Sequence, residues 1–170
     1  MQDYETCSER ILIRRARRGD VQAFGILYGR IYKDLYRFAL YTMKQTQDAE
    51  DVVSETVVTA YEKLHQLKKE ESFRSWIFTI LANQCKKHFR KNGNTDELTE
   101  GVAVQEVNHE ENQDIRNAFM QLNEDDRMII ACSVFGGYPS EEIGSMMQMN
   151  PATVRSRKAR ALEKMRQMVE

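Results

Sequence analysis

The chain has 170 residues, a length that suits one or two small domains with a buried core. Its 25 Lys and Arg residues stand against 26 Asp and Glu residues, so the net charge is −1 and a uniformly basic nucleic-acid-binding protein is excluded. Apolar residues make up 41% of the chain and charged residues 30%, a balance that excludes an intrinsically disordered protein. Only 8 glycines and 2 prolines occur, and both prolines (Pro139 and Pro151) fall in the last third, so the composition predicts an all-α fold.

The three cysteines, Cys7, Cys85 and Cys132, form no Cys-x-x-Cys pair, and only three histidines accompany them. The sequence therefore predicts no metal site, no cofactor and no disulfide scaffold, and it favours a reducing, cytoplasmic location. The arginines within residues 10–18 exclude the apolar core of a signal peptide. No apolar run approaches the ~20 residues that cross a bilayer, so we expect no membrane insertion.

Four amphipathic helices are predicted in the first part of the chain, which we expect to form one domain over residues 1–92. They are expected at residues 8–18, 21–43, 48–66 and 73–91. Asp20 is a suitable N-cap for the second helix. The first helix is rich in arginine, whereas the third begins with acidic side chains, which stabilise a helix N-terminus.

The composition changes at residues 93–113, which contain six acidic residues and no Lys or Arg. This stretch has no helical period and is predicted to be an acidic linker, with a fully extended reach of roughly 70 Å. Residues 114–170 are again helical in pattern and form a second predicted domain. Its last two helices are expected at 140–147 and from Pro151 to near the C-terminus.

These last two helices have the pattern of a helix-turn-helix. Asn150 is a good N-cap, Pro151 suits the first helical position, and Gly144 is small where two crossing helices approach closely. We expect four cations to point outward from the second helix of the pair. They are Arg155, Arg157, Lys158 and Arg160. Such a helix can enter the DNA major groove, although a solvated basic face would have the same composition.

A second cationic segment ends the helix predicted at residues 73–91. Four cations there are unopposed by any acid, and Asn83 precedes them by one turn. They are Lys86, Lys87, Arg90 and Lys91. Cations beside amide and aromatic side chains suit single-stranded nucleic acid, but cations also suit any helix C-terminus. Because no nucleophile, metal-ligand cluster or phosphate-binding glycine loop occurs, we do not expect an enzyme.

The order of these segments resembles that of the bacterial sigma-70 family, in particular its small extracytoplasmic-function (ECF, group 4) members. The resemblance covers about residues 10–168. It is carried by the segments GDVQAFGILYGRIYKDLYRFA, AEDVVSETVVTAYEKL, SFRSWIFTILANQCKKHFRK and LNEDDRMIIACSVFGGYPSEEIGSMMQMNPATVRSRKARALEKMR. It implies two helical domains, a sigma-2 domain and a sigma-4 domain joined by a flexible linker, that act with core RNA polymerase on promoter DNA.

The resemblance also implies roles for individual residues. The residues implied to contact the polymerase clamp are Asp51, Val52, Ser54 and Glu55. Those implied to contact the −10 element are Asn83 and, after it, Lys86, Lys87, Arg90 and Lys91. Those implied to contact the −35 element are Thr153, Arg155, Ser156, Arg157, Lys158 and Arg160. The sigma-4 domain would also bind the polymerase flap, and an anti-sigma factor commonly holds members of this family in check.

The family usually has Gly where this chain has Gln148, so a left-handed backbone at that turn would be strained. The residues alone leave two other functions open. One is a stand-alone helix-turn-helix regulator with an N-terminal partner-binding domain, and the other is an interaction module that has lost DNA binding.

Overall fold

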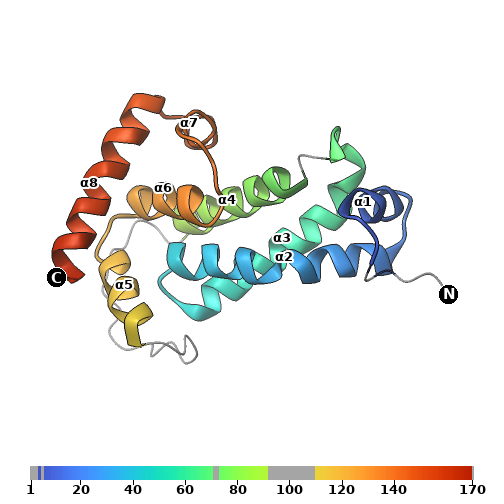
Figure 1. Cartoon of the computed structure of the whole chain (residues 1–170), viewed down its shortest axis with the longest axis horizontal. Coiled ribbons are helices and arrows are strands. Elements are labelled where there is room, and N and C mark those ends of the chain that lie inside the picture. The colour runs from blue at the N-terminus through green and yellow to red at the C-terminus, as the bar shows by residue number, and fades with distance from the viewer. Residues whose placement is uncertain (1–3, 5, 71–72, 92–109, 170) are drawn as a thin grey trace.

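The computed structural model describes residues 4, 6–70, 73–91 and 110–169, and every regular element in these ranges is helical (Figure 1). The N-terminal domain contains α1 (Glu9–Arg17), α2 (Val21–Thr42), α3 (Thr46–Lys63), the 3₁₀ turn η1 (Leu64–Gln66) and α4 (Phe73–Lys91). The C-terminal domain contains α5 (Glu110–Met120), α6 (Glu124–Val134), α7 (Ser140–Met147) and α8 (Pro151–Val169). The prediction of an all-α fold with two helical domains is confirmed.

Helix boundaries follow the sequence signals closely. Asp20 caps α2 as predicted, because its carboxylate accepts a hydrogen bond from the Ala23 N–H at 3.1 Å. Helix α5 begins at Glu110, so the last four residues of the predicted linker are helical. The rest of that linker, residues 93–109, lies outside the described residues.

The N-terminal domain is built around α2, which packs against α1, α3 and α4. Apolar side chains recur along α2 at steps of three and four and are buried. Phe38 of α2 meets Phe78 of α4 edge to face, with ring centroids 5.7 Å apart, and both rings are fully buried. These contacts fix α3 and α4, the two helices that carry the predicted clamp and −10 residues.

The C-terminal domain packs directly on the N-terminal domain, with α6 against the second half of α2 (Figure 1). Met128, Ile129 and Cys132 of α6 belong to the same buried apolar cluster as Phe38 and Phe78. A smaller cluster surrounds Tyr41 of α2, whose ring lies 5.1 Å from Phe119 and 4.9 Å from Phe135. The two domains therefore share a hydrophobic core in this structure.

A buried arginine reinforces this contact. Arg127 of α6 is only 2% exposed, and its guanidinium donates to the Thr42 carbonyl at 3.0 Å and to the Leu122 carbonyl at 2.5 Å. A buried charge is costly unless it is hydrogen-bonded, and here the carbonyls at the end of α2 and before α6 supply the acceptors. Arg127 thus ties α6 to the C-terminal end of α2.

The helix-turn-helix has the predicted caps and close approach. The Asn150 side chain accepts from the Ala152 N–H at 2.8 Å. A Cβ atom added at Gly144 would lie 2.6 Å from the Met149 carbonyl oxygen, so only glycine fits there. Gln148 closes α7 in the left-handed conformation, with φ 55° and ψ 49°. The strain expected at this position is therefore present in the turn.

We predict that Gln148→Gly stabilises the protein by about 0.5–1 kcal/mol, because glycine adopts positive φ without a Cβ clash. Urea-induced unfolding followed by circular dichroism measures the difference. Gln148→Ala is the matched control, since alanine shortens the side chain and keeps the strained Cβ. Equal stability of the glycine and alanine variants would contradict the prediction.

Candidate nucleic-acid interface

The N-terminal half of α8 presents most of the predicted −35 residues to solvent. Thr153, Arg155, Ser156 and Arg160 are exposed, and Lys158 is half-buried. Val154 lies on the opposite side of the helix and is fully buried. Arg155 lies 3.6 Å from Glu141, but both side chains are more than half exposed, so this ion pair is weak and leaves the guanidinium available.

The outward orientation predicted for Arg157 is wrong. Its Nε donates to Asp126 at 2.9 Å, and its other nitrogens donate to Asn123 at 3.3 Å and to Asp125 at 3.5 Å. Its side chain is 23% exposed, against 58% for Arg155. The acidic first turn of α6 therefore holds Arg157, and this residue joins α8 to α6. The sequence signal for this was the Asn-Glu-Asp-Asp run that starts α6.

The cationic side chains at the end of α4 point in two directions. Asn83, Lys87, Arg90 and Lys91 are exposed. Lys86 is half-buried, and its ammonium donates to the Met146 carbonyl in the last turn of α7. Burial lowers the pKa of Lys86. Lys86 therefore faces the C-terminal domain in this structure, whereas its neighbours face solvent.

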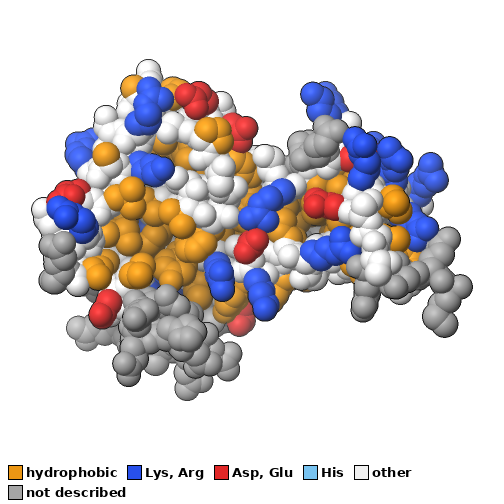
Figure 2. Space-filling view, viewed as in Figure 1, with side chains coloured by type: hydrophobic (Ala, Val, Ile, Leu, Met, Phe, Trp, Pro, Cys, Tyr) orange, Lys and Arg blue, Asp and Glu red, His pale blue; other side chains and the backbone are white. Residues whose placement is uncertain are grey.

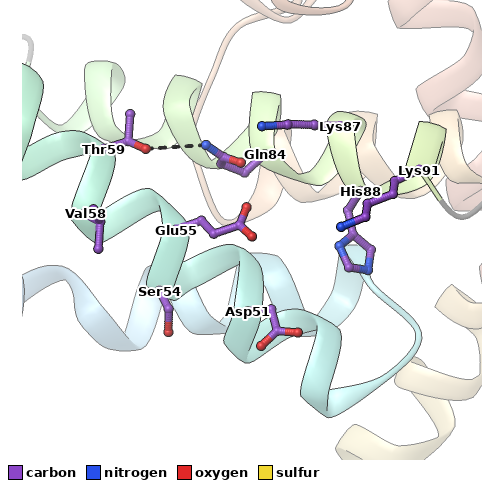
Figure 3. A pocket seen from close by; sticks show the side chains of 9 residues that line it. All are labelled: Asp51, Ser54, Glu55, Val58, Thr59, Gln84, Lys87, His88 and Lys91. Carbon is purple, nitrogen blue, oxygen red and sulfur yellow. Dashed lines mark hydrogen bonds between the residues drawn. The ribbon is translucent and has the colours of Figure 1, made fainter.

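The predicted clamp residues lie across a groove from the α4 cations (Figure 3). The residues that line this space of about 520 Å³ include Asp51, Ser54 and Glu55 from α3 and Lys87 and Lys91 from α4. The lining of the groove therefore carries both charges. The sequence assigned these residues to two separate contacts and did not indicate that they line a common groove.

Val52 differs from the other predicted clamp residues because it is fully buried (0% exposed) in the core of the N-terminal domain. The prediction that Val52 contacts a partner is therefore wrong for the folded protein. The adjacent Thr56 is also buried, and its hydroxyl donates to the Val52 carbonyl. This face of α3 packs against the rest of the domain and orients Asp51, Ser54 and Glu55 outward.

Hydrogen bonds from side chains to carbonyls hold α4 and the C-terminal domain together. The Tyr138 hydroxyl donates to the Ser75 carbonyl at 2.8 Å, and burial raises the pKa of Tyr138. Arg74 donates to the Phe135 carbonyl at 3.2 Å. With the bond from Lys86 to α7, these contacts keep α8 and α4 at a fixed separation. The two cationic helices are therefore parts of a closed arrangement.

Among the residues that the structure describes, no cluster of three His, Cys, Asp or Glu side chains could hold a metal ion. Within the same residues, no helix is long and apolar enough to cross a membrane.

Comparison with known proteins identifies both domains. Residues 27–95 match the model of Sigma-70 region 2, and residues 112–165 match that of Sigma-70, region 4. The chain belongs to the sigma-70 family. Region 2 thus corresponds to α2–α4 and region 4 to α5–α8 of this sigma factor.

Proteins with similar sequences indicate to which group of the family this chain belongs. The ECF RNA polymerase sigma-E factor of Escherichia coli K12 is 28% identical, with 94% of this chain and 93% of that protein covered. The RNA polymerase sigma-H factor of Pseudomonas aeruginosa is also 28% identical, with 89% of each chain covered. The chain is therefore an ECF-type RNA polymerase sigma factor.

Solved structures with the same fold include two complexes. The structure of CnrH in complex with the cytosolic domain of CnrY matches with a TM-score of 0.70 at 24% identity, covering 95% of this chain and 96% of that one. The sigma factor RpoE of Bartonella quintana, in complex with the anti-sigma factor NepR, matches with a TM-score of 0.71 at 25% identity, covering 88% and 98%.

The buried thiols report whether the closed arrangement opens. Cys85 of α4 and Cys132 of α6 are fully buried in the shared core, and burial raises the pKa of Cys132 to about 12. Replacing two interdomain donors, in Lys86→Met with Tyr138→Phe, removes hydrogen bonds of about 1 kcal/mol each. We predict that alkylation of both thiols then accelerates on the order of 10-fold.

Mass spectrometry after timed alkylation measures each cysteine separately. Cys7 is half-exposed and outside the interface, so its rate is an internal reference. The matched control is Lys87→Met with Tyr32→Phe, which changes the same side-chain types at exposed sites. Rates at Cys85 and Cys132 that match this control would contradict the prediction.

Proposed function

We propose that this sigma factor carries core RNA polymerase to promoters by applying two separate nucleic-acid surfaces, one on α4 and one on α8. The observation that supports this most directly is the exposure of cations on both helices in a protein of net charge −1. In this proposal the sigma factor is not itself an enzyme, needs no cofactor, and acts in the cytoplasm, where polymerase and DNA are found.

For the −35 element, the proposed reading surface is the exposed N-terminal part of α8. It consists of Thr153, Arg155, Ser156, Lys158 and Arg160. A helix that enters the major groove uses its N-terminal residues on base edges, and arginine pairs with guanine through two hydrogen bonds. Arg157 supports this surface indirectly, because its bonds to Asp126 and Asn123 hold α8 on α6.

For the −10 element, the proposed surface is the exposed side of α4. It consists of Asn83, Lys87, Arg90 and Lys91, with Lys86 joining once its bond to Met146 breaks. An amide beside cations suits a strand whose bases are unpaired. Region 2 would then hold the DNA where the duplex melts.

The polymerase contacts are proposed on α3 for the clamp and on region 4 for the flap. Asp51, Ser54 and Glu55 are exposed along α3 and supply carboxylates and a hydroxyl for a polar contact. Val52 supports them from the core. The proximity of Lys87 and Lys91 across the groove means that a partner bound to α3 would lie beside the −10 surface.

The closed arrangement must open for this function, because one DNA duplex presents its two elements at distant positions. We divide the chain into a sigma-2 domain (1–92), a linker (93–113), whose residues 110–113 form the first turn of α5, and a sigma-4 domain (114–170). A linker that reaches roughly 70 Å corresponds to about 20 base pairs of duplex. Its acidic composition would keep it off DNA phosphates.

An anti-sigma factor is the proposed inhibitor. The similar structure from Bartonella quintana is titled as a sigma factor in complex with an anti-sigma factor. In this chain, apolar side chains gather over α5 and the end of α2 (Figure 2). Exposed apolar residues on these helices include Ile115 and Tyr32, each 41% exposed. A contiguous apolar face of this kind suits a protein partner.

The direct test is transcription in vitro with core polymerase, purified sigma factor and fragmented genomic DNA from the source cell. We expect transcription to begin at a small, reproducible set of start sites that core polymerase alone does not use. Mapping the 5′ ends of the transcripts measures this. Start sites identical to those of core polymerase alone would reject the proposed function.

On such promoters, we predict that Arg155→Ala and Arg160→Ala each lower initiation roughly 5- to 100-fold, since a lost base or phosphate contact costs about 1–3 kcal/mol. Their thermal stability should stay unchanged, because both side chains are exposed. Arg157→Ala should also lower the free energy of unfolding, by about 1–2 kcal/mol. Lys164→Ala, on the same helix farther from the N-terminus, is the control. Equal losses from Lys164→Ala would show that overall charge, and not this surface, determines activity.

A further inference from the structure

Two of the three cysteines lie in the shared core, one from each domain. Cys85 belongs to α4 and Cys132 to α6, and both side chains are fully buried. Both are members of the apolar cluster that joins the two domains. The third cysteine, Cys7, is half-exposed and precedes α1. The two buried thiols therefore come from different domains and share one core only while those domains are packed together.

The two thiols occupy helix faces that point into this core. On α4, the side chains of Phe78, Leu81 and Cys85 recur at steps of three and four and are buried. On α6, Met128 and Cys132 are one turn apart and are also buried. Each cysteine is therefore directed toward the apolar cluster to which both domains contribute.

Hydrogen bonds between the domains lie on either side of the two cysteines. The Cys132 carbonyl accepts from the Tyr138 N–H at 3.1 Å, and the Tyr138 hydroxyl donates to the Ser75 carbonyl of α4 at 2.8 Å. Lys86 directly follows Cys85, and its ammonium donates to a carbonyl in the last turn of α7. Helix α4 is thus held against the C-terminal domain at two points along its length.

Electrostatic interactions place Cys132 close to two consecutive residues of α4. Burial, and after it the neighbouring Cys132, raise the pKa of Cys85. Burial also raises the pKa of Cys132 to about 12, although the Lys86 ammonium lowers it. Such interactions weaken with distance, so both are consistent with a Cys132 side chain near positions 85 and 86. At neutral pH both groups are thiols and not the reactive thiolates.

Opening of the domains, which the proposed function requires, would change the reactivity of this pair. Separation removes the part of the cover that each thiol receives from the other domain, and in water the pKa of a cysteine is about 8.5. Lys86 and Lys87 directly follow Cys85, and nearby cations favour the thiolate. The thiols would therefore react in the open protein, and closure would bring them together again.

We propose that Cys85 and Cys132 are the two halves of a disulfide site across the domain interface, formed by reaction with a peroxide. Peroxide oxidises one thiol to a sulfenic acid and leaves as one water molecule. The second thiol then attacks this sulfur, which forms the S–S bond and releases the sulfenic oxygen as a second water molecule. Two thiols are thus oxidised, and one peroxide is reduced to two water molecules.

The consequence of this bond is a covalent link between α4 and α6 that holds the protein in the closed arrangement. Oxidation would therefore stop transcription initiation, and reduction by a thiol would restore it. This consequence rests on the proposed function, whereas the formation of the bond does not. A reversible bond of this kind is compatible with a reducing cell, where disulfides are usually transient.

The test of the bond is oxidation of the full-length protein with hydrogen peroxide. The remaining thiols are then blocked, and the protein is digested with trypsin without reductant and analysed by mass spectrometry. Trypsin releases Cys85 within residues 75–86 and Cys132 within residues 128–155. We expect these two peptides to be joined, and dithiothreitol to separate them. The urea concentration at the midpoint of unfolding should rise on oxidation, because a disulfide restrains the unfolded chain.

The matched control is Cys7→Ser, which removes the third thiol and should keep the joined peptides. Cys132→Ala should lose them, with circular dichroism to confirm that the variant is folded. In transcription with core polymerase, oxidised wild type should fall to the level of core polymerase alone and recover with dithiothreitol. The oxidised Cys132→Ala protein should stay as active as its reduced form.

The digest of wild type decides the proposal even if a variant unfolds. Absence of the joined peptides, or a main product in which Cys7 replaces either cysteine, would overturn the disulfide site. Joined protein that initiates transcription as well as the reduced protein would overturn the closed state as its consequence. Reduced protein that does not initiate at all would contradict the proposed function, and the digest, which needs no polymerase, would still decide on the bond.

Discussion

The burial of α6 against α2 and α4 is the contact on which the arrangement of the whole molecule depends. A fully buried apolar side chain such as Met128 or Ile129 contributes about 1.5–3 kcal/mol. Arg127 adds a directional constraint, because its guanidinium donates to the Thr42 carbonyl only while α6 lies at the end of α2. Separation of the domains therefore exposes apolar surface and breaks this hydrogen bond. The polymerase, a much larger partner, can supply contacts that compensate for this loss.

The distribution of charge follows from the same architecture. Cations are concentrated on α1, the end of α4 and the start of α8, while carboxylates on α3 and at the start of α6 balance them. Non-specific binding to duplex DNA depends on the number of phosphates neutralised at once. A nearly neutral protein with separated cationic surfaces therefore binds free DNA weakly. In the proposed function, assembly with polymerase would align these surfaces and so give promoter binding without loss of the protein to other DNA.

The positions of the helices could be predicted from the sequence because the signals that start and end a helix are local. The caps at Asp20 and Asn150 and the close approach at Gly144 each depend on residues within a few positions. The errors concern side chains whose partners are distant in the chain. Arg157 pairs with Asp126, 31 residues away. Val52 was assigned to the clamp contact through the family resemblance alone, although it occupies the core face of α3. The docking of the two domains likewise had no local signal.

Lys86 is assigned two different contacts, one within the protein and one proposed with nucleic acid. Its ammonium cannot donate to the last turn of α7 and neutralise a phosphate simultaneously. Domain closure and nucleic-acid binding by this lysine are therefore mutually exclusive, and thermodynamic reciprocity requires that each weakens the other by the same factor. If Lys86 contacts DNA as proposed, DNA binding would favour release of region 4. The bond from Lys86 to α7 would in turn weaken DNA binding by α4 until the domains separate.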